Sequence, residues 1–159
     1  NGLDFAIASI HDPCYTSGTV AQNTAAYLGA MKNPAVQIIG HPDDGRFPVD
    51  YETLVCAAKE NHVLLEVNSS SLHPQCHRLN AKENYITMLE LCRRHPDFYR
   101  LAGSDTHQDG DEARAGVILP ERVHDSYQYK AMIEARRFRL WSPEFQSFVD
   151  ADEAMRAGK

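Results

Sequence analysis

The sequence predicts an α/β protein built on a parallel sheet, curved or open, whose strands are joined by right-handed crossover helices. Short apolar runs that resemble buried strands alternate with segments whose apolar residues recur at helical spacing. Four of these runs end in polar loops. The polar residues that follow them are spaced by about thirty residues, the length of one βα unit; they are His11, His41, Asn68 and Asp105.

The first two units place a strand before each of two histidines. Asp4–Ile10 is apolar and stops at His11, as expected of a buried parallel strand that ends in a loop. Thr19–Lys32 is predicted to be a crossover helix, since apolar residues recur along one face. The residues expected to face inward are Val20, Ala25, Tyr27, Leu28 and Met31. Val36–Gly40 predicts a second strand, which His41 and a proline terminate.

The next two units repeat the pattern. Asp50 is a good N-cap for a helix that extends to about Asn61, and the third strand, Val63–Val67, follows it. A helix capped by Asn80 then leads to the fourth strand, Tyr99–Ala102. The residues of that helix expected to face inward are Ile86, Leu89 and Cys92. Four consecutive units of this kind predict a parallel sheet.

The C-terminal quarter of the sequence departs from this pattern. Val117–Pro120 is a short extended run, and Ser126 can cap a helix that extends to about Arg137. Phe138–Trp141 is expected to return as an edge strand. The tail from Ser142 to Lys159 is charged and weakly amphipathic.

Composition bounds the class of protein. The 159 residues suffice for one domain with a core, and we treat 1–159 as a single domain. A net charge of -6 argues against a nucleic-acid partner. No apolar run approaches the roughly 18 residues of a membrane span, and no leader opens the sequence, so we expect a cytoplasmic protein without a membrane partner. The four cysteines show no C-x-x-C spacing, which favours reduced thiols.

The polar residues at the strand ends predict a metal centre. In parallel α/β proteins, functional side chains gather at the carboxyl ends of strands, so His11, His41, Asp105 and His107 are expected to meet there. A D-x-H pair alone is weak, because such residues also occur in surface turns. Nitrogen and oxygen ligands together suit zinc, manganese or iron better than calcium.

Four further residues are candidates for binding substrate. Asn68 and Ser69 lie where the sheet should emerge and could donate hydrogen bonds to substrate oxygens, although a plain Asx turn explains them equally well. Arg46 and Arg78 could hold an anionic group through paired N–H donors, although solvated arginines are commoner. The sequence contains no G-x-S-x-G, P-loop or G-x-G-x-x-G motif, which leaves serine hydrolysis, P-loop nucleotide chemistry and dinucleotide binding without support.

Taken in order, the motifs G-H-P at Gly40, E-V-N-S-S at Glu66 and G-S-D-x-H at Gly103 resemble those of the PHP (polymerase and histidinol phosphatase) superfamily. The chain looks most similar to its small stand-alone phosphatases and phosphoesterases. The resemblance covers roughly Leu3 to Phe138.

The resemblance implies a distorted seven-stranded (β/α) barrel of the TIM type that holds up to three divalent metal ions. His11 and His41 would share one ion, while Asp105 and His107 would serve two different ones. The implied reaction is hydrolysis of a small phosphomonoester by metal-activated water, in which Asp105 or a nearby histidine such as His107 relays protons. The family's opening H-x-H pair and bridging glutamate have no counterpart here, so the chain resembles the C-terminal portion of such a barrel, without its first strands.

Several alternatives stay open from the sequence. Glu66 lies within a strand and either faces the helices at a salt-bridge position or points into the barrel as an acid that supports the metal ligands. A metal-dependent amidohydrolase also builds its site from histidines at strand ends and a late aspartate. A non-catalytic remnant that keeps the fold as an accessory module is the third possibility. The oligomeric state and the identity of the substrate do not follow from the sequence.

Overall fold

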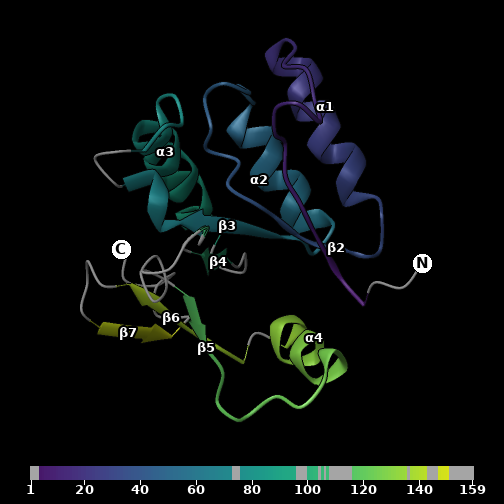
Figure 1. Ribbon diagram of the computed structural model, residues 1–159, viewed down its shortest axis with the longest axis vertical. Coiled ribbons are helices and arrows are strands. Elements are labelled where there is room, and N and C mark those ends of the chain that lie inside the picture. The colour runs from purple at the N-terminus through teal and green to yellow at the C-terminus, as the bar shows by residue number, and fades with distance from the viewer. Residues whose placement is uncertain are drawn as a thin grey trace.

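The computed structural model describes residues 4–72, 76–95, 100–103, 105, 107, 116–135, 137–142 and 147–150, and within them the fold is α/β. Four parallel strands form one sheet in the order β1 (Ala6–Ala8), β2 (Val36–Ile39), β3 (Leu64–Asn68) and β4 (Arg100–Gly103). Three helices alternate with them: α1 (Val20–Met31), α2 (Tyr51–Glu60) and α3 (Ala81–Arg93). All three helices lie on the same side of the sheet (Figure 1). The predicted parallel sheet with crossover helices is confirmed.

The main core lies between the parallel sheet and these helices. Its fully buried side chains come from β2, β3, α2 and α3, and include Ile39, Leu54, Leu65 and Met88. The opposite face of the sheet has a smaller core, where Ile38 and Leu64 pack against α4 (Ser126–Glu134). Burying both faces explains why these strands are almost continuously apolar. Within the described residues, no helix is long and apolar enough to cross a membrane.

A second sheet of three antiparallel strands follows β4. Its order is β5 (Gly116–Ile118), β6 (Arg139–Ser142) and β7 (Ser147–Asp150). The strand predicted at Phe138–Trp141 therefore exists, but it lies at the centre of this sheet rather than at an edge, because β7 pairs with its outer side.

The inward face of α1 differs from the prediction. Tyr27 and Met31 are buried as expected, but Val20 and Ala25 are exposed, and two polar residues, Asn23 and Thr24, take their place. Asn23 Nδ2 donates to the Pro48 carbonyl at 3.1 Å, and Thr24 Oγ1 accepts from the Asp50 amide at 2.9 Å. These residues are buried because they tie α1 to the loop that precedes α2, which an apolar pattern does not reveal.

The ends of two helices also differ from the prediction. α3 begins after Asn80 as expected, but Asn80 has a left-handed backbone and makes no capping bond with its side chain. Along α3 the buried face includes Cys92 and Met88, whereas Ile86 is exposed. α4 is capped by Asp125 rather than Ser126 and ends at Glu134 rather than near Arg137.

Gly45 fixes the loop after β2 against the start of α3. Its amide donates to the Leu79 carbonyl at 2.7 Å, and a Cβ at this position would collide with that same oxygen. We expect Gly45→Ala to lower the free energy of unfolding by about 1–3 kcal/mol, because a backbone atom cannot yield as a side chain does. Gly29→Ala in α1 is the control, since a Cβ there meets nothing within 4 Å and should stabilise the helix by about 0.5–1 kcal/mol. Urea unfolding of both variants measures the difference, and equal effects would contradict this reading.

Candidate active site at the carboxyl ends of the strands

The carboxyl ends of the four parallel strands meet along one edge of the sheet. His11 follows β1, His41 follows β2, Asn68 ends β3, and Asp105 follows β4. Asn68 lies in register with Gly103, so the last two strands end at the same level. This is the edge at which parallel α/β proteins bind their ligands.

His11 and His41 face each other across this edge. Their Nε2 atoms are 3.2 Å apart and their ring centroids 4.7 Å apart, with the rings at 76° to each other. His41 is buried and His11 is exposed. Burial, and then the positive charge of Arg78, hold the pKa of His41 below its ordinary value. A neutral imidazole of this kind can present a lone pair to a cation.

Glu66 points toward this site rather than toward the helices, which decides between the two orientations considered from the sequence. Its Oε2 accepts a hydrogen bond from the His41 amide at 2.8 Å and a longer one from Asn68 Nδ2 at 3.3 Å. Burial raises the pKa of this carboxyl, although the two hydrogen bonds oppose the shift.

Arg78 and Asp105 form an ion pair beside the histidines. One terminal nitrogen of Arg78 donates to Asp105 Oδ2, and the other donates to Ser70 Oγ at 2.8 Å and to Ser71 Oγ at 3.0 Å. The Arg78 side chain is 9% exposed, so this guanidinium is a buried cation rather than a solvated one. Asp105 has a left-handed backbone, with φ of 56°.

His107, like His11, is exposed. Its side chain is 77% exposed, and Nδ1 lies 2.6 Å from the carbonyl oxygen of Asp105, which requires the proton to be on Nδ1. The site thus holds two pairs, His11 with His41 and Asp105 with His107. Within the described residues, no group of three or more His, Cys, Asp or Glu side chains is close enough to hold a metal ion by itself.

Three of the four candidate substrate-binding residues, Asn68, Ser69 and Arg78, lie at or beside the turn after β3, and the fourth, Arg46, is paired with Asp44. Asn68 is buried, and its Oδ1 accepts from the Ser70 amide at 3.0 Å and the Ser70 hydroxyl at 2.7 Å, so it shapes the turn after β3. Ser69 is partly buried there. Arg78 lies within the site. Arg46 is instead held by Asp44, whose Oδ1 and Oδ2 each lie 3.0 Å from Arg46 Nε.

Sequence reasoning missed Asp43, which lies two residues after His41. Asp43 is 1% exposed, and neither carboxylate oxygen makes a hydrogen bond of good geometry among the described residues, although the Ser71 hydroxyl is close enough to affect its pKa. Burial raises the pKa of Asp43 to about 6, while the Ser71 hydroxyl and the Arg78 charge oppose this shift. The consecutive aspartates of the H-P-D-D-G loop were the available signal, but they read as ordinary turn residues.

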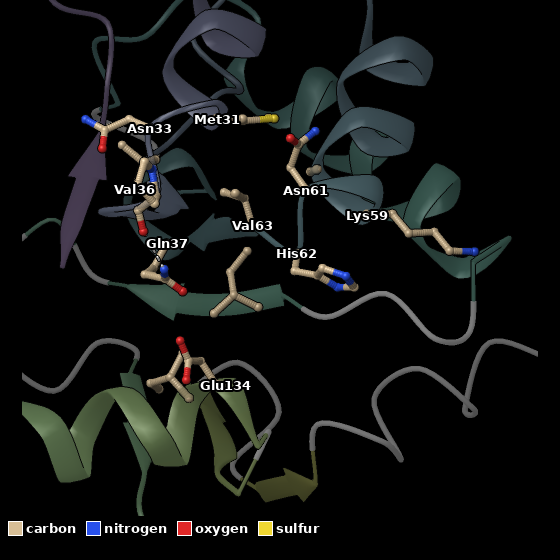
Figure 2. A pocket seen from close by; sticks show the side chains of 13 residues that line it. Met31, Asn33, Val36, Gln37, Lys59, Asn61, His62, Val63 and Glu134 are labelled. Carbon is tan, nitrogen blue, oxygen red and sulfur yellow. Dashed lines mark hydrogen bonds between the residues drawn. The ribbon is translucent and has the colours of Figure 1, made fainter.

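A cavity of about 380 Å³ lies at the opposite end of the sheet. Gln37 on β2 and His62 after α2 lie on one side of it, and Glu134 at the end of α4 lies on the other (Figure 2). Buried core side chains such as Val63 also line it. None of the candidate metal ligands or substrate-binding residues lines this cavity, and the amino ends of parallel strands serve stability rather than chemistry in barrel enzymes. We therefore place the candidate active site at the other end.

Comparison with known proteins points to phosphatases. A probable phosphatase of Caldicellulosiruptor bescii is 44% identical over 115 residues, which are 72% of this chain and 46% of that protein. A probable phosphatase of Caldicellulosiruptor saccharolyticus is 40% identical over 129 residues, 81% of this chain and 52% of that protein. The chain spans about half the length of the curated relatives it matches. The sequence profiles of known families give no match. These similarities suggest a phosphatase family.

Proposed function

We propose that the protein is a metal-dependent phosphatase that hydrolyses a small phosphomonoester in the cytoplasm. The observation that carries the proposal is the contact between His11 and His41, whose Nε2 atoms lie 3.2 Å apart at the carboxyl edge of the sheet. The names of the relatives support a phosphorylated substrate. The negative net charge of the chain favours a small molecule over a nucleic acid.

The paired histidines fit a divalent metal ion. Two nitrogen ligands at about 2.0–2.1 Å from a tetrahedral zinc ion lie about 3.3 Å apart, close to the spacing observed here. His11 and His41 would hold one ion, and Asp105 and His107 would serve two others in a complete domain. Manganese and iron accept the same nitrogen and oxygen donors. The missing ligands would belong to the part of the relatives that this chain does not span.

Such ions, when bound, would lower the pKa of an attacking water and neutralise charge on the phosphate. The chain's own residues supply the rest of the chemistry that we propose. A guanidinium has five N–H donors, and the three hydrogen bonds of Arg78 leave capacity for phosphate oxygens. Asn68 and Ser69 would orient the turn behind the phosphate. Asp105 or His107 would pass a proton to the leaving alcohol.

We further propose that the parallel sheet is part of a barrel of the PHP superfamily type. β1 pairs with β2 on one side, and no described strand pairs with its other side. Ile7 on β1 lies in register with Ile38, yet Ile7 is 57% exposed while Ile38 is buried against α4. Further strands beside β1 would cover Ile7 and close the sheet.

Metal binding tests the proposal directly. We expect the full-length gene product to bind Zn²⁺ or Mn²⁺ and to hydrolyse p-nitrophenyl phosphate only with metal. Because each histidine would supply one ligand of a shared ion, His11→Ala and His41→Ala should each weaken metal binding by at least ~10-fold in calorimetric titration. His124→Ala, at an exposed histidine before α4, is the matched control.

Three results would contradict the proposal. The first is purification without stoichiometric metal, as expected of a non-catalytic remnant. The second is equal metal affinity in all three variants, and the third is turnover without metal. Metal-dependent cleavage of amides but not phosphate esters would favour the amidohydrolase alternative.

A further inference from the structure

Glu66 carries a carboxylate within the parallel sheet, and Gly103 on the neighbouring strand makes room for it. Gly40 lies at the end of β2 on one side, and Gly103 ends β4 on the other. A Cβ at Gly103 would collide with the Glu66 carboxylate, whereas one at Gly40 would collide with Ser9 Oγ and make only an ordinary contact with Glu66 Oε2 at 3.6 Å. In β4 the residue in register with Glu66 is two positions before Gly103, so the carboxylate leans along β3 toward the strand ends. The side chain is therefore directed at the carboxyl edge of the sheet, where His11 and His41 lie.

The contact of Glu66 with His41 falls on the backbone rather than on the imidazole. His41 has a backbone φ of 29°, a conformation that residues other than glycine rarely adopt. Its amide donates to Glu66 Oε2 at 2.8 Å. Hydrogen bonds to charged acceptors are stronger than those between neutral groups. Since the backbone sets where the side chain projects, an acceptor at this point determines how the His41 ring meets His11.

We propose that Glu66 is a positioning residue that holds the His41 backbone in its left-handed conformation and so keeps the imidazole facing His11. The proposal rests on the proposed function only for its consequence, which is the affinity of the paired histidines for metal. The hydrogen-bond geometry, the backbone of His41 and the space that Gly103 leaves for the carboxylate all belong to the protein without metal. Nothing in this role requires Glu66 to touch substrate.

A matched pair of substitutions separates the hydrogen bond from the volume of the side chain. Glu66→Gln keeps an acceptor oxygen in place, whereas Glu66→Met keeps the length but offers only a weakly accepting sulfur. In metal-free protein, we expect hydrogen exchange of the His41 amide, measured by NMR, to accelerate at least ~10-fold in Glu66→Met. Glu66→Gln should change it much less. Titration with Zn²⁺ should show affinity lower by ~10–100-fold in Glu66→Met and near wild type in Glu66→Gln.

A steric variant tests the same role without altering Glu66. Gly103→Ala displaces the carboxylate, so it should reproduce the faster exchange of the His41 amide. Gly116→Ala in β5, where a Cβ meets nothing within 4 Å, should leave that exchange unchanged. Circular dichroism and thermal unfolding identify any variant that fails to fold, and the remaining variants then decide the question.

Hydrogen exchange of the His41 amide and titration with Zn²⁺ test the role of Glu66 and the proposed function separately. If wild-type protein binds no metal, the proposed function fails, while the exchange of the His41 amide still tests the role of Glu66. If Glu66→Met leaves that exchange unchanged, or if Gln and Met accelerate it equally, the positioning role is wrong. Equal Zn²⁺ affinity in both variants and wild type would also overturn it.

Discussion

Asparagine in place of Asp105 is expected to lower kcat/KM for p-nitrophenyl phosphate by at least ~100-fold, the scale of a lost acid, base or ligand group. Asparagine is the informative substitution because it tolerates the left-handed backbone, here with φ of 56°, as well as aspartate does. It retains the side-chain volume and removes only the charge. That charge is the partner of Arg78 and, in the proposed mechanism, also serves the metal ions and the leaving alcohol.

Asp125→Asn is the control for this prediction. Asp125 caps α4 through a hydrogen bond of 2.8 Å from the Gln128 amide to Oδ1, and asparagine caps helices equally well. The variant should keep wild-type activity and stability. The assay uses the full-length gene product with Mn²⁺ or Zn²⁺ in excess. If Asp105→Asn stays within about threefold of wild type, Asp105 takes no part in the proton or metal chemistry proposed here.

The sequence predicted which residues end the strands, because that information is local. Apolar runs and the breakers that follow them determine where a strand stops, so His41 before a proline could be placed correctly. Asp50 could be identified as a helix cap on the same grounds, and its Oδ1 accepts from the Thr53 amide at 3.1 Å. The parallel order of the sheet then followed from the crossover helices.

The partners of the site residues could not be predicted, because they depend on contacts between distant segments. Arg78 was considered for binding an anion, but its guanidinium meets Asp105, which is 27 residues away. Arg46 was considered for the same role, and its guanidinium is paired with Asp44, two residues before it. The direction of Glu66 depended on which face of the sheet the helices cover, and alternation along a strand does not decide that.

Asp43→Asn is expected to remove a destabilising effect that grows as the pH rises. Burial raises the pKa of the Asp43 carboxyl from 3.8 to about 6, so the folded protein holds this proton more tightly than the unfolded chain does. The group's contribution to stability is therefore fully present below the unfolded pKa and is lost as the pH rises through about 6. The difference between the two pKa values corresponds to about 3 kcal/mol.

Asparagine does not titrate, so the comparison with wild type isolates this carboxyl from other groups. From about pH 4 to about pH 7, the free energy of unfolding of wild type should fall by about 2 kcal/mol relative to Asp43→Asn, as measured by urea unfolding. Asp44→Asn is the matched control, because the pKa of the Asp44 carboxyl is shifted in the opposite direction from that of Asp43. Although burial alone would raise its pKa, hydrogen bonds from Arg46 hold the pKa of Asp44 below its ordinary value, so Asp44 stabilises the fold as the pH rises. If wild type and Asp43→Asn run parallel over this range, the Asp43 carboxylate has a partner in solution that offsets its burial.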